Sequence, residues 1–275
     1  MKISIITINY NNLAGLQETY RSIIAQTYKD YEWIVIDGGS NQGDKAFLAE
    51  HEKDLAYWCS EPDNGVYNAQ NKGIVHAKGE YLIFMNSGDT FYDPDVLHHV
   101  FSQKQTADII YGDWIQRFED GREITMNAPH VFSFHFIYND NICHQAIFIK
   151  NEVLKKSPYD ESLKYYADWA KWIELSLQKY TFLYVPYTIC YFMMGGLSQN
   201  MNALQIEQER ETLRAKYVPT AIKETMAYIA TLQGKTYHEL AIEADMFIKK
   251  RVLYKKILHI AIRIIHLLEK LSNHK

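Results

Sequence analysis

Residues 81–91 decide the predicted fold and read Y-L-I-F-M-N-S-G-D-T-F. Tyr81 to Met85 form an apolar run, which is typical of a buried strand in a parallel sheet. The run ends in a polar turn whose last residue is Asp89. Ligands of open α/β sheets bind beyond the carboxyl ends of the parallel strands. The stretch therefore predicts a central strand that presents Asp89 at a ligand-binding edge, although an Asp that only caps a turn is common at such places.

The chain on both sides of this strand alternates between expected strands and helices. Such alternation predicts a doubly wound, mostly parallel α/β sheet flanked by helices. The expected strands span 3–8, 32–36, 57–60 and 107–111, and the expected helices span 13–24, 45–53, 66–77 and a segment that begins at Asp93-Pro94 and runs through Phe101.

The pattern changes after Asp113. A hairpin is expected where residues 114–118 and 122–126 flank a turn. Further on we expect strands over 143–149, 181–185 and 189–193, a helix over 168–179, and mostly helix from about Ala203 onward. We therefore predict a catalytic domain over 1–200, divided into halves 1–113 and 114–200, and a helical C-terminal appendage over 201–275.

Composition narrows the class of protein. The 275 residues carry a formal net charge of −4, which argues against a general nucleic-acid binder. Cys59, Cys143 and Cys190 are far apart and form no C-x-x-C pair, so neither a disulfide framework nor a zinc site is indicated. No apolar run has the length of a membrane span, and the first residues lead directly into an expected strand without a signal-peptide layout. These features favour a cytoplasmic globular protein.

Three carboxylates stand at expected strand ends or at a helix start. Asp37 could bind a nucleobase or ribose, Asp89 could hold a divalent metal on a diphosphate, and Asp168 could take a proton from an attacking hydroxyl. Each has a structural alternative as well. Asp37 could serve only its glycine turn, Asp168 could be a helix N-cap, and His144 could be a core histidine.

Several stretches in this order resemble family 2 glycosyltransferases of the GT-A fold. They are S-I-I-T-I-N-Y-N at 4–11, I-D-G-G-S at 36–40, D-N-G-V-Y-N-A-Q-N-K-G at 63–73 and G-E-Y-L-I-F-M-N-S-G-D at 79–89. H-Q-A at 144–146, A-D-W at 167–169 and G-G-L-S at 195–198 match the second half of the same pattern. The resemblance covers about residues 1–200. Within the family, the stretches look most like the bacterial enzymes of exopolysaccharide and colanic-acid assembly.

The resemblance implies a nucleotide-sugar pocket at the first strands of the sheet. Thr7, Asn9 and Tyr10 would line the nucleotide pocket through backbone and ring contacts. Asp37 would bind the base, usually uracil, and Asn71 would lie along the donor.

The resemblance also implies a metal and a catalytic base. Ser87 and Asp89 stand at the two acidic positions of the D-x-D motif, so Asp89 would be the one direct carboxylate ligand of Mn²⁺ or Mg²⁺. Asp168 would be the base of an inverting reaction, although this chain has Ala167 where the family commonly has Glu. His144 would contact the diphosphate or the acceptor.

The implied function is transfer of a sugar from a nucleotide-diphosphate donor, usually a UDP-sugar, to a hydroxyl of a glycan acceptor, usually lipid-linked, in polysaccharide biosynthesis. Two alternatives stay open at this point. A sugar nucleotidyltransferase would carry a basic glycine-rich loop after its first strand, and residues 9–15 contain no Lys or Arg. A degenerate nucleotide-binding protein without catalysis is favoured by Ser87 in place of an acid.

Residues 245–275 have a composition of their own. The segment contains eight Lys and Arg residues but only two acidic residues, Asp245 and Glu269. Apolar residues lie between them at helical spacing. A basic amphipathic helix of this kind can lie on an anionic membrane surface or pack on protein. We therefore expect either a peripheral contact with the inner face of the membrane or packing of this helix on protein.

Overall fold

The computed structural model describes residues 2–196 and 203–232. The chain divides into two compact units, Met1–Val218 and Pro219–Lys275. The described part of the second unit is the helix α9 (Thr220–Leu232). The expected basic helix over 245–275 lies outside the described residues, and the division of the chain at residue 200 stays a prediction.

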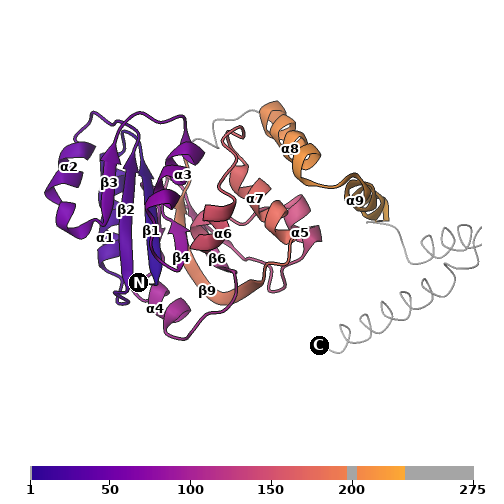
Figure 1. Cartoon of the computed structure of the whole chain (residues 1–275), viewed down its shortest axis with the longest axis horizontal. Helices are drawn as coiled ribbons and strands as arrows, with labels where there is room; N and C mark the ends of the chain where they lie inside the picture. Colours follow the sequence, from indigo (N-terminus) through magenta and orange to yellow (C-terminus); the bar gives the residue numbers. More distant parts are fainter. Residues whose placement is uncertain (1, 197–202, 233–275) are drawn as a thin grey trace, which may run out of the picture. The chain divides into compact units, whose positions relative to one another are not determined.

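The first unit is built on a mixed sheet (Figure 1). Its strand order in the described residues is β3-β2-β1-β4-β8-β6-β9-β5, with β7 paired to β6. The pairings make β1, β2, β3, β4, β6 and β9 run in one direction and β5, β7 and β8 in the other. The strands are β1 (Ile3–Asn9), β2 (Tyr31–Asp37), β3 (Tyr57–Ser60), β4 (Tyr81–Phe84), β5 (Thr90–Phe91), β6 (Ile109–Arg117), β7 (Glu123–Met126), β8 (Ile147–Lys150) and β9 (Phe182–Met193). The predicted mostly parallel α/β sheet is confirmed.

Helices connect and flank these strands. α3 packs against β1 and β2, where a Cβ on Gly73 would stand 2.5 Å from Ile6 Cγ2, so only glycine permits this approach. The helices of this unit are α1 (Leu13–Ile24), α2 (Asp44–Glu50), α3 (Val66–His76), α4 (Val96–Phe101), α5 (Phe134–Asn139), α6 (Asn151–Lys156), α7 (Ala167–Ser176) and α8 (Ala203–Tyr217), with 3₁₀ turns η1 (Glu52–Asp54) and η2 (His144–Ala146).

The start of α1 shows how local chemistry places an element at the edge of the sheet. The Asn12 side chain accepts a hydrogen bond from the Gly15 N–H at 3.1 Å and caps the helix. Leu16, Thr19 and Ile23 follow at helical spacing and are buried. The first turn of α1 is thereby held beside the carboxyl ends of β1 and β4.

The ends of the central strands meet at one edge. β1 and β2 are parallel and in register, with Asn9 opposite Asp37. The chain beyond β4 stays against β1, because the Ser87 N–H donates to the Ile8 carbonyl at 3.1 Å. The turn 86–89 therefore lies at the same edge as the end of β1, as its sequence predicts.

Several expected elements differ in the structure, and the strands expected over 107–111 and 114–118 are one strand, β6. Residues 144–146 form the η2 turn, and β8 begins only at Ile147, because the polar part of the expected strand is used for side-chain contacts. The two strands expected over 181–193 are one strand, β9, which follows β6 across an irregular register between Tyr111 and Trp114. Helix α4 starts at Val96, since the Pro94 carbonyl accepts the Thr27 N–H at 2.8 Å.

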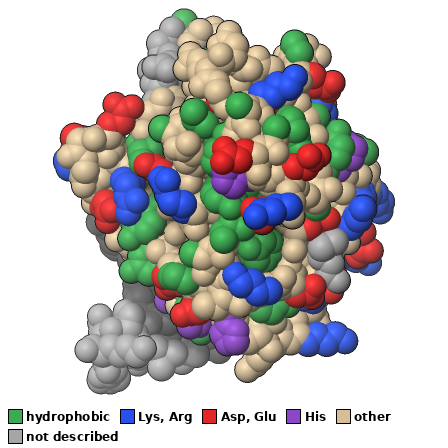
Figure 2. Space-filling model, turned by 90° about the vertical axis from the view of Figure 1, so that its left-hand side faces the viewer, with side chains coloured by type: hydrophobic (Ala, Val, Ile, Leu, Met, Phe, Trp, Pro, Cys, Tyr) green, Lys and Arg blue, Asp and Glu red, His purple; other side chains and the backbone are tan. Residues whose placement is uncertain are grey.

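Two surface features bear on possible partners. Figure 2 shows acidic and basic side chains interspersed over the face that it presents, without a broad area of one sign. Among the described residues, no helix combines the length and the hydropathy that a membrane crossing requires.

Candidate active site

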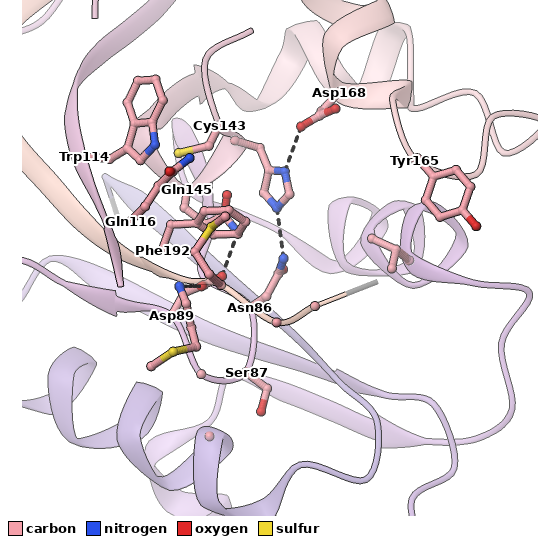
Figure 3. A pocket seen from close by; sticks show the side chains of 18 of the residues that line it. Asn86, Ser87, Asp89, Trp114, Gln116, Cys143, Gln145, Tyr165, Asp168 and Phe192 are labelled. Atoms are coloured by element: carbon pink, nitrogen blue, oxygen red, sulfur yellow. Dashed lines mark hydrogen bonds and ion pairs between the residues drawn. The ribbon is translucent and has the colours of Figure 1, made fainter. Parts of the chain in front are cut away.

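A cavity of about 640 Å³ opens beyond the carboxyl ends of β1 and β4 (Figure 3). Its walls come from the starts of α1 and α3, the turn 86–89, the η2 turn, the segment that leads into α7, and strands β6, β7 and β9. Polar members of the lining include Asn12, Glu18, Tyr67, Asn86, Ser87, Asp89, Gln116, Glu119, Asp140, Asn141, His144, Gln145, Lys164, Tyr165, Tyr166 and Asp168. Four residues singled out from the sequence, Ser87, Asp89, His144 and Asp168, thus line one cavity.

Asp89 is held from two sides. Its Oδ2 accepts a hydrogen bond from the Gln145 side-chain amide at 2.7 Å, and its Oδ1 accepts one from the Met193 N–H at 2.9 Å. Only 4% of the residue is exposed. Burial raises the pKa of the Asp89 carboxyl to about 6, against the opposing effect of these two hydrogen bonds. Each carboxylate oxygen still has a lone pair available to a cation.

Asp168 lies in the first turn of α7, where the helix dipole favours a negative charge. Its Oδ1 accepts hydrogen bonds from the Trp169 N–H at 2.7 Å and from the Tyr67 hydroxyl at 3.2 Å. Its Oδ2 lies 3.0 Å from His144 Nδ1. Three neighbouring groups therefore hold the Asp168 carboxylate in place at the cavity. Its role as a catalytic base stays a prediction. Burial, together with the nearby Asp168 charge, raises the pKa of the Tyr67 hydroxyl, so this group remains a donor.

His144 bridges Asp168 to the turn that carries Asp89 (Figure 3). Its Nε2 lies 2.9 Å from the Asn86 amide nitrogen and 3.3 Å from that of Gln70. Because both neighbours present amide N–H groups, Nε2 accepts and the Nδ1 proton is donated to Asp168. Contact of His144 with the diphosphate or the acceptor stays a prediction.

Asn9 lies behind the cavity wall and links it to the sheet. The Ser87 hydroxyl donates to Asn9 Oδ1 at 2.7 Å. The Asn9 amide in turn donates to Asp37 at 2.7 Å and to Asp44 at 2.9 Å. Asn9 therefore orients Ser87, and a direct contact of Asn9 with the donor stays a prediction.

Asp37 and Thr7 are fully buried and do not line the cavity. Asp37 accepts hydrogen bonds from the Ser40 hydroxyl at 2.5 Å and the Ser60 hydroxyl at 2.6 Å, besides that from Asn9. Burial alone would raise the pKa of Asp37, but these hydrogen bonds outweigh it and hold the pKa below the ordinary value. Thr7 accepts the Trp33 indole N–H at 2.9 Å. The roles of both residues in nucleotide binding stay predictions.

Tyr10 and Asn71 also lie outside the cavity lining. The Tyr10 side chain is 68% exposed, so its ring is free to meet a base. Asn71 exchanges two hydrogen bonds with the Tyr159 backbone, both at 2.9 Å, and donates to the Glu161 carboxylate at 2.8 Å. Asn71 therefore joins α3 to the loop 159–161, and its contact with the donor stays a prediction.

Sequence reasoning missed several cavity residues. One of them is Gln145, which contacts Asp89. It directly follows His144 in the H-Q-A segment, and this position is the one feature of the sequence that points to it. Trp114 and Gln116 are two residues apart on β6 and share one face of that strand. The Trp114 indole nitrogen is buried without a hydrogen-bond partner in the described structure. A buried donor without a partner is rare in folded proteins, so this nitrogen is an unusual feature of the wall.

The cavity lining is rich in carboxylates, which bears on whether it could bind a metal cation. Among the described residues, five carboxylates line the cavity, on Glu18, Asp89, Glu119, Asp140 and Asp168, against one ammonium, that of Lys164. The described residues contain no group of three or more His, Cys, Asp or Glu placed to hold a metal by themselves. Mg²⁺ commonly uses one or two carboxylates and takes its other ligands from phosphates and water. The lining therefore fits a cation that takes most of its ligands from a bound anion and from water, and Asp89 as its carboxylate ligand stays a prediction.

Comparison with known proteins agrees with this geometry. Residues 4–161 match the family described as Glycosyl transferase family 2. An uncharacterized glycosyltransferase of Mycobacterium tuberculosis is 37% identical over 158 residues, which are 56% of this chain and 60% of that protein. A PGL/p-HBAD biosynthesis glycosyltransferase of Mycobacterium bovis is 32% identical over 176 residues, 60% of this chain and 66% of that protein. The matches thus span less than two thirds of these relatives.

Solved structures show the same fold. Staphylococcus aureus TarS in complex with UDP-GlcNAc superposes with a TM-score of 0.62 at 15% identity, over 87% of this chain and 78% of that one. The mannosyltransferase PcManGT from Pyrobaculum calidifontis, in complex with GDP-Man and Mn²⁺, gives a TM-score of 0.54 at 14% identity, over 93% and 82%. The expected GT-A architecture is confirmed by these superpositions.

Proposed function

Because the chain belongs to the family 2 glycosyltransferases, we propose that its cavity transfers a sugar from a nucleoside diphosphate to a hydroxyl of a glycan acceptor, with inversion at the anomeric carbon. One observation carries this proposal. Asp168 and Asp89 line the same cavity, the first held by donors at a helix start and the second at the end of the central parallel strands.

The turn 86–89 is the proposed place of the diphosphate. An anionic diphosphate would be repelled by five carboxylates unless a cation accompanies it. Asp89 would hold Mn²⁺ or Mg²⁺, which when bound neutralises the charge that develops on the leaving diphosphate. Ser87 would support this turn through its hydrogen bond to Asn9.

Asp168 is the proposed base. The acceptor hydroxyl oxygen forms a bond to the anomeric carbon while the bond from that carbon to the diphosphate oxygen breaks. The hydroxyl proton passes to a carboxylate oxygen of Asp168, and the electron pair of the broken bond leaves with the diphosphate. Tyr67 and the Trp169 N–H hold the carboxylate in place during this step.

The acceptor is proposed to lie against the wall made by β6, β7 and β9. Trp114 stands opposite Met126 and Gln116 opposite Phe192 in the register of these strands. This wall combines the apolar side chains of Trp114, Met126 and Phe192 with the polar side chain of Gln116. Such a surface suits a sugar ring, which has apolar C–H faces and hydroxyls at its rim.

We further propose a UDP-sugar donor and a lipid-linked acceptor. TarS was crystallised with UDP-GlcNAc, which supports UDP as the nucleotide. The relatives named for PGL/p-HBAD biosynthesis support an acceptor in glycolipid or polysaccharide assembly. A lipid-linked acceptor would agree with the basic segment 245–275 lying on a membrane surface.

Calorimetric titration tests the donor site. UDP and GDP are titrated with and without Mn²⁺ into the wild-type chain and into Asp89→Ala. We expect UDP to bind only with the metal and the Asp89→Ala variant to lose this binding, because it loses the carboxylate ligand. Binding of GDP in place of UDP would change the donor class but keep the mechanism. Binding that is strong without metal and unchanged in Asp89→Ala would contradict the proposed donor site.

Release of nucleotide in the absence of an acceptor tests catalysis. UDP-GlcNAc, UDP-glucose, UDP-galactose and GDP-mannose are incubated with the enzyme and Mn²⁺, with water as the acceptor. Slow hydrolysis of one donor, abolished in Asp168→Asn, supports the proposed reaction. A folded chain that hydrolyses none of them would favour the degenerate nucleotide-binding alternative.

A further inference from the structure

Two consecutive residues hold the two acids on which the proposed function rests. His144 Nδ1 lies 3.0 Å from Asp168 Oδ2, and the Gln145 amide lies 2.7 Å from Asp89 Oδ2. From this geometry we infer that His144 and Gln145 form a positioning clamp, which fixes the base on α7 relative to the donor-side acid at the end of β4. The inference rests on the proposed function.

The His144 arm reaches both sides of the cavity. The imidazole is in contact with Asp168 through Nδ1 and with Asn86 through Nε2, at 3.0 and 2.9 Å. Asn86 belongs to the turn that carries Asp89, and the Asp89 N–H donates to the Asn86 carbonyl at 2.9 Å. The ring also packs edge-on against Phe84 of β4. Its orientation is therefore set by the donor-side strand and turn before it meets the base.

The Gln145 arm reaches the donor side only. Gln145 is 1% exposed, and its amide is a side-chain donor to Asp89. The other oxygen of Asp89 is taken by the Met193 N–H of β9. Removing Gln145 would leave the Asp89 carboxylate held at one oxygen only, by the Met193 N–H, so its orientation would be less fixed.

The link between the arms is short and stiff. Consecutive Cα atoms are about 3.8 Å apart, so the two side chains depart from almost the same point. The η2 turn is closed by the Ala146 N–H, which donates to the Cys143 carbonyl at 3.0 Å, and β8 follows directly. The start of α7 and the turn 86–89 therefore cannot shift independently. A misplacement of about 1 Å at a reacting centre can lower the rate by about 100-fold, which gives such a clamp a catalytic purpose.

Two isosteric variants of His144 test the first arm. Asparagine places its amide where Nδ1 lies, and glutamine places its amide nearer to Nε2. With UDP-GlcNAc, or with whichever of the four donors the wild type hydrolyses fastest, we expect His144→Asn to keep most of the turnover and His144→Gln to lose about 100-fold in kcat. KM for the donor should stay unchanged in His144→Gln, since this variant keeps an amide near Asn86 and loses the contact with the base. His98→Asn, at an exposed position of α4, is the matched control.

Gln145→Met tests the second arm. Methionine has a similar length but no donor, so Asp89 should lose its orientation and UDP with Mn²⁺ should bind more weakly by about tenfold. A merely structural role would lower thermal stability in all variants alike and would not separate a loss in kcat from a loss in nucleotide binding. Equal turnover of His144→Asn and His144→Gln, or unchanged UDP affinity in Gln145→Met, would overturn the clamp.

The Asp168→Asn variant distinguishes a failure of the clamp from a failure of the proposed function. If it is inactive while the His144 variants are equal to each other, the proposed base stands and the clamp is wrong. If Asp168→Asn keeps wild-type hydrolysis, or the wild type hydrolyses no donor, the proposed function fails and the clamp fails with it.

Discussion

Asp89 is an unfavourable residue for the stability of the empty fold. Its carboxyl is buried, and the pKa rises from the ordinary 3.8 to about 6. A rise of this size corresponds to about 3 kcal/mol of folding stability lost when the group is ionised. The two hydrogen bonds from Gln145 and Met193 reduce this cost but do not remove it. A buried acid with a perturbed pKa beside a cavity is common at functional sites, which agrees with the proposed role of Asp89 as a metal ligand.

At the level of this residue we expect Asp89→Asn to stabilise the empty protein. Because the pKa is raised in the folded state, the contribution of protonated Asp89 is fully present below about pH 4 and is lost as the pH rises through about 6. The gain from Asp89→Asn should therefore be up to about 3 kcal/mol near pH 7.5 and smaller near pH 5. The Gln145 amide can rotate to present its oxygen to the new amide group.

Guanidinium unfolding of both proteins at the two pH values measures this difference. The same variant should lose metal-dependent UDP binding, which gives opposite signs for stability and function. A variant that is less stable than the wild type near pH 7.5 would show that the carboxylate is compensated in the folded state.

At the level of elements, Asn71 is the residue that fastens α3 to the loop 159–161. Its amide donates to the Tyr159 carbonyl and to Glu161, and its oxygen accepts the Tyr159 N–H. This loop leads to the segment that enters α7, so the attachment also bears on where Asp168 stands. The sequence resemblance implies instead that Asn71 contacts the donor.

Asn71→Ala distinguishes these two roles. If the side chain is an attachment, we expect a loss of about 1–3 kcal/mol in unfolding free energy, because buried backbone groups of Tyr159 lose their partner. UDP affinity with Mn²⁺ should then be unchanged at a temperature where the variant is folded. Unchanged stability together with weaker UDP binding would support the donor contact. Asn68→Ala, one turn earlier on α3, is the control, because Asn68 also donates to Glu161 at 2.9 Å and accepts the Asn64 N–H at 3.2 Å but has no bond to Tyr159.

At the level of the whole molecule, the cavity belongs to one compact unit. Its lining residues in the described part of the chain fall between Asn12 and Gly196, within Met1–Val218. The basic segment 245–275 belongs to the other unit, and its structure lies outside the described residues. Truncation can therefore test the proposed donor site and the proposed membrane contact of the basic segment separately.

We expect a chain ending at Val218 to bind UDP with Mn²⁺ as the full chain does. In co-sedimentation, the full chain should bind vesicles that contain phosphatidylserine and lose this binding in high salt, because lysines and arginines meet anionic lipid. The truncated chain should stay in solution. Equal sedimentation of both chains would show that the basic segment is not the membrane contact. Loss of UDP binding on truncation would show that the second unit supports the cavity.

The sheet and its ligand-binding edge were predictable because both are encoded locally. Apolar runs such as 3–8 and 81–85 report burial through their own composition, and the Asn and Asp turns after them report where each strand stops. The η2 turn was not predictable in this way, since H-Q-A followed by an apolar run reads as the start of a strand. Its backbone is bent because its side chains have partners elsewhere in the chain.

The sequence by itself therefore determined the family, the parallel half of the sheet and the polar turn that carries Asp89 at the end of its central strand. Only the tertiary structure decided which polar side chains face the cavity and which are satisfied inside the protein. Asp37 is enclosed by Ser40, Ser60 and Asn9, whereas Asp89 meets Gln145 and Met193, which are 56 and 104 residues away in the chain. Periodicity records whether a residue is buried, but a hydrogen-bond partner at that separation is chosen only when the strands come together.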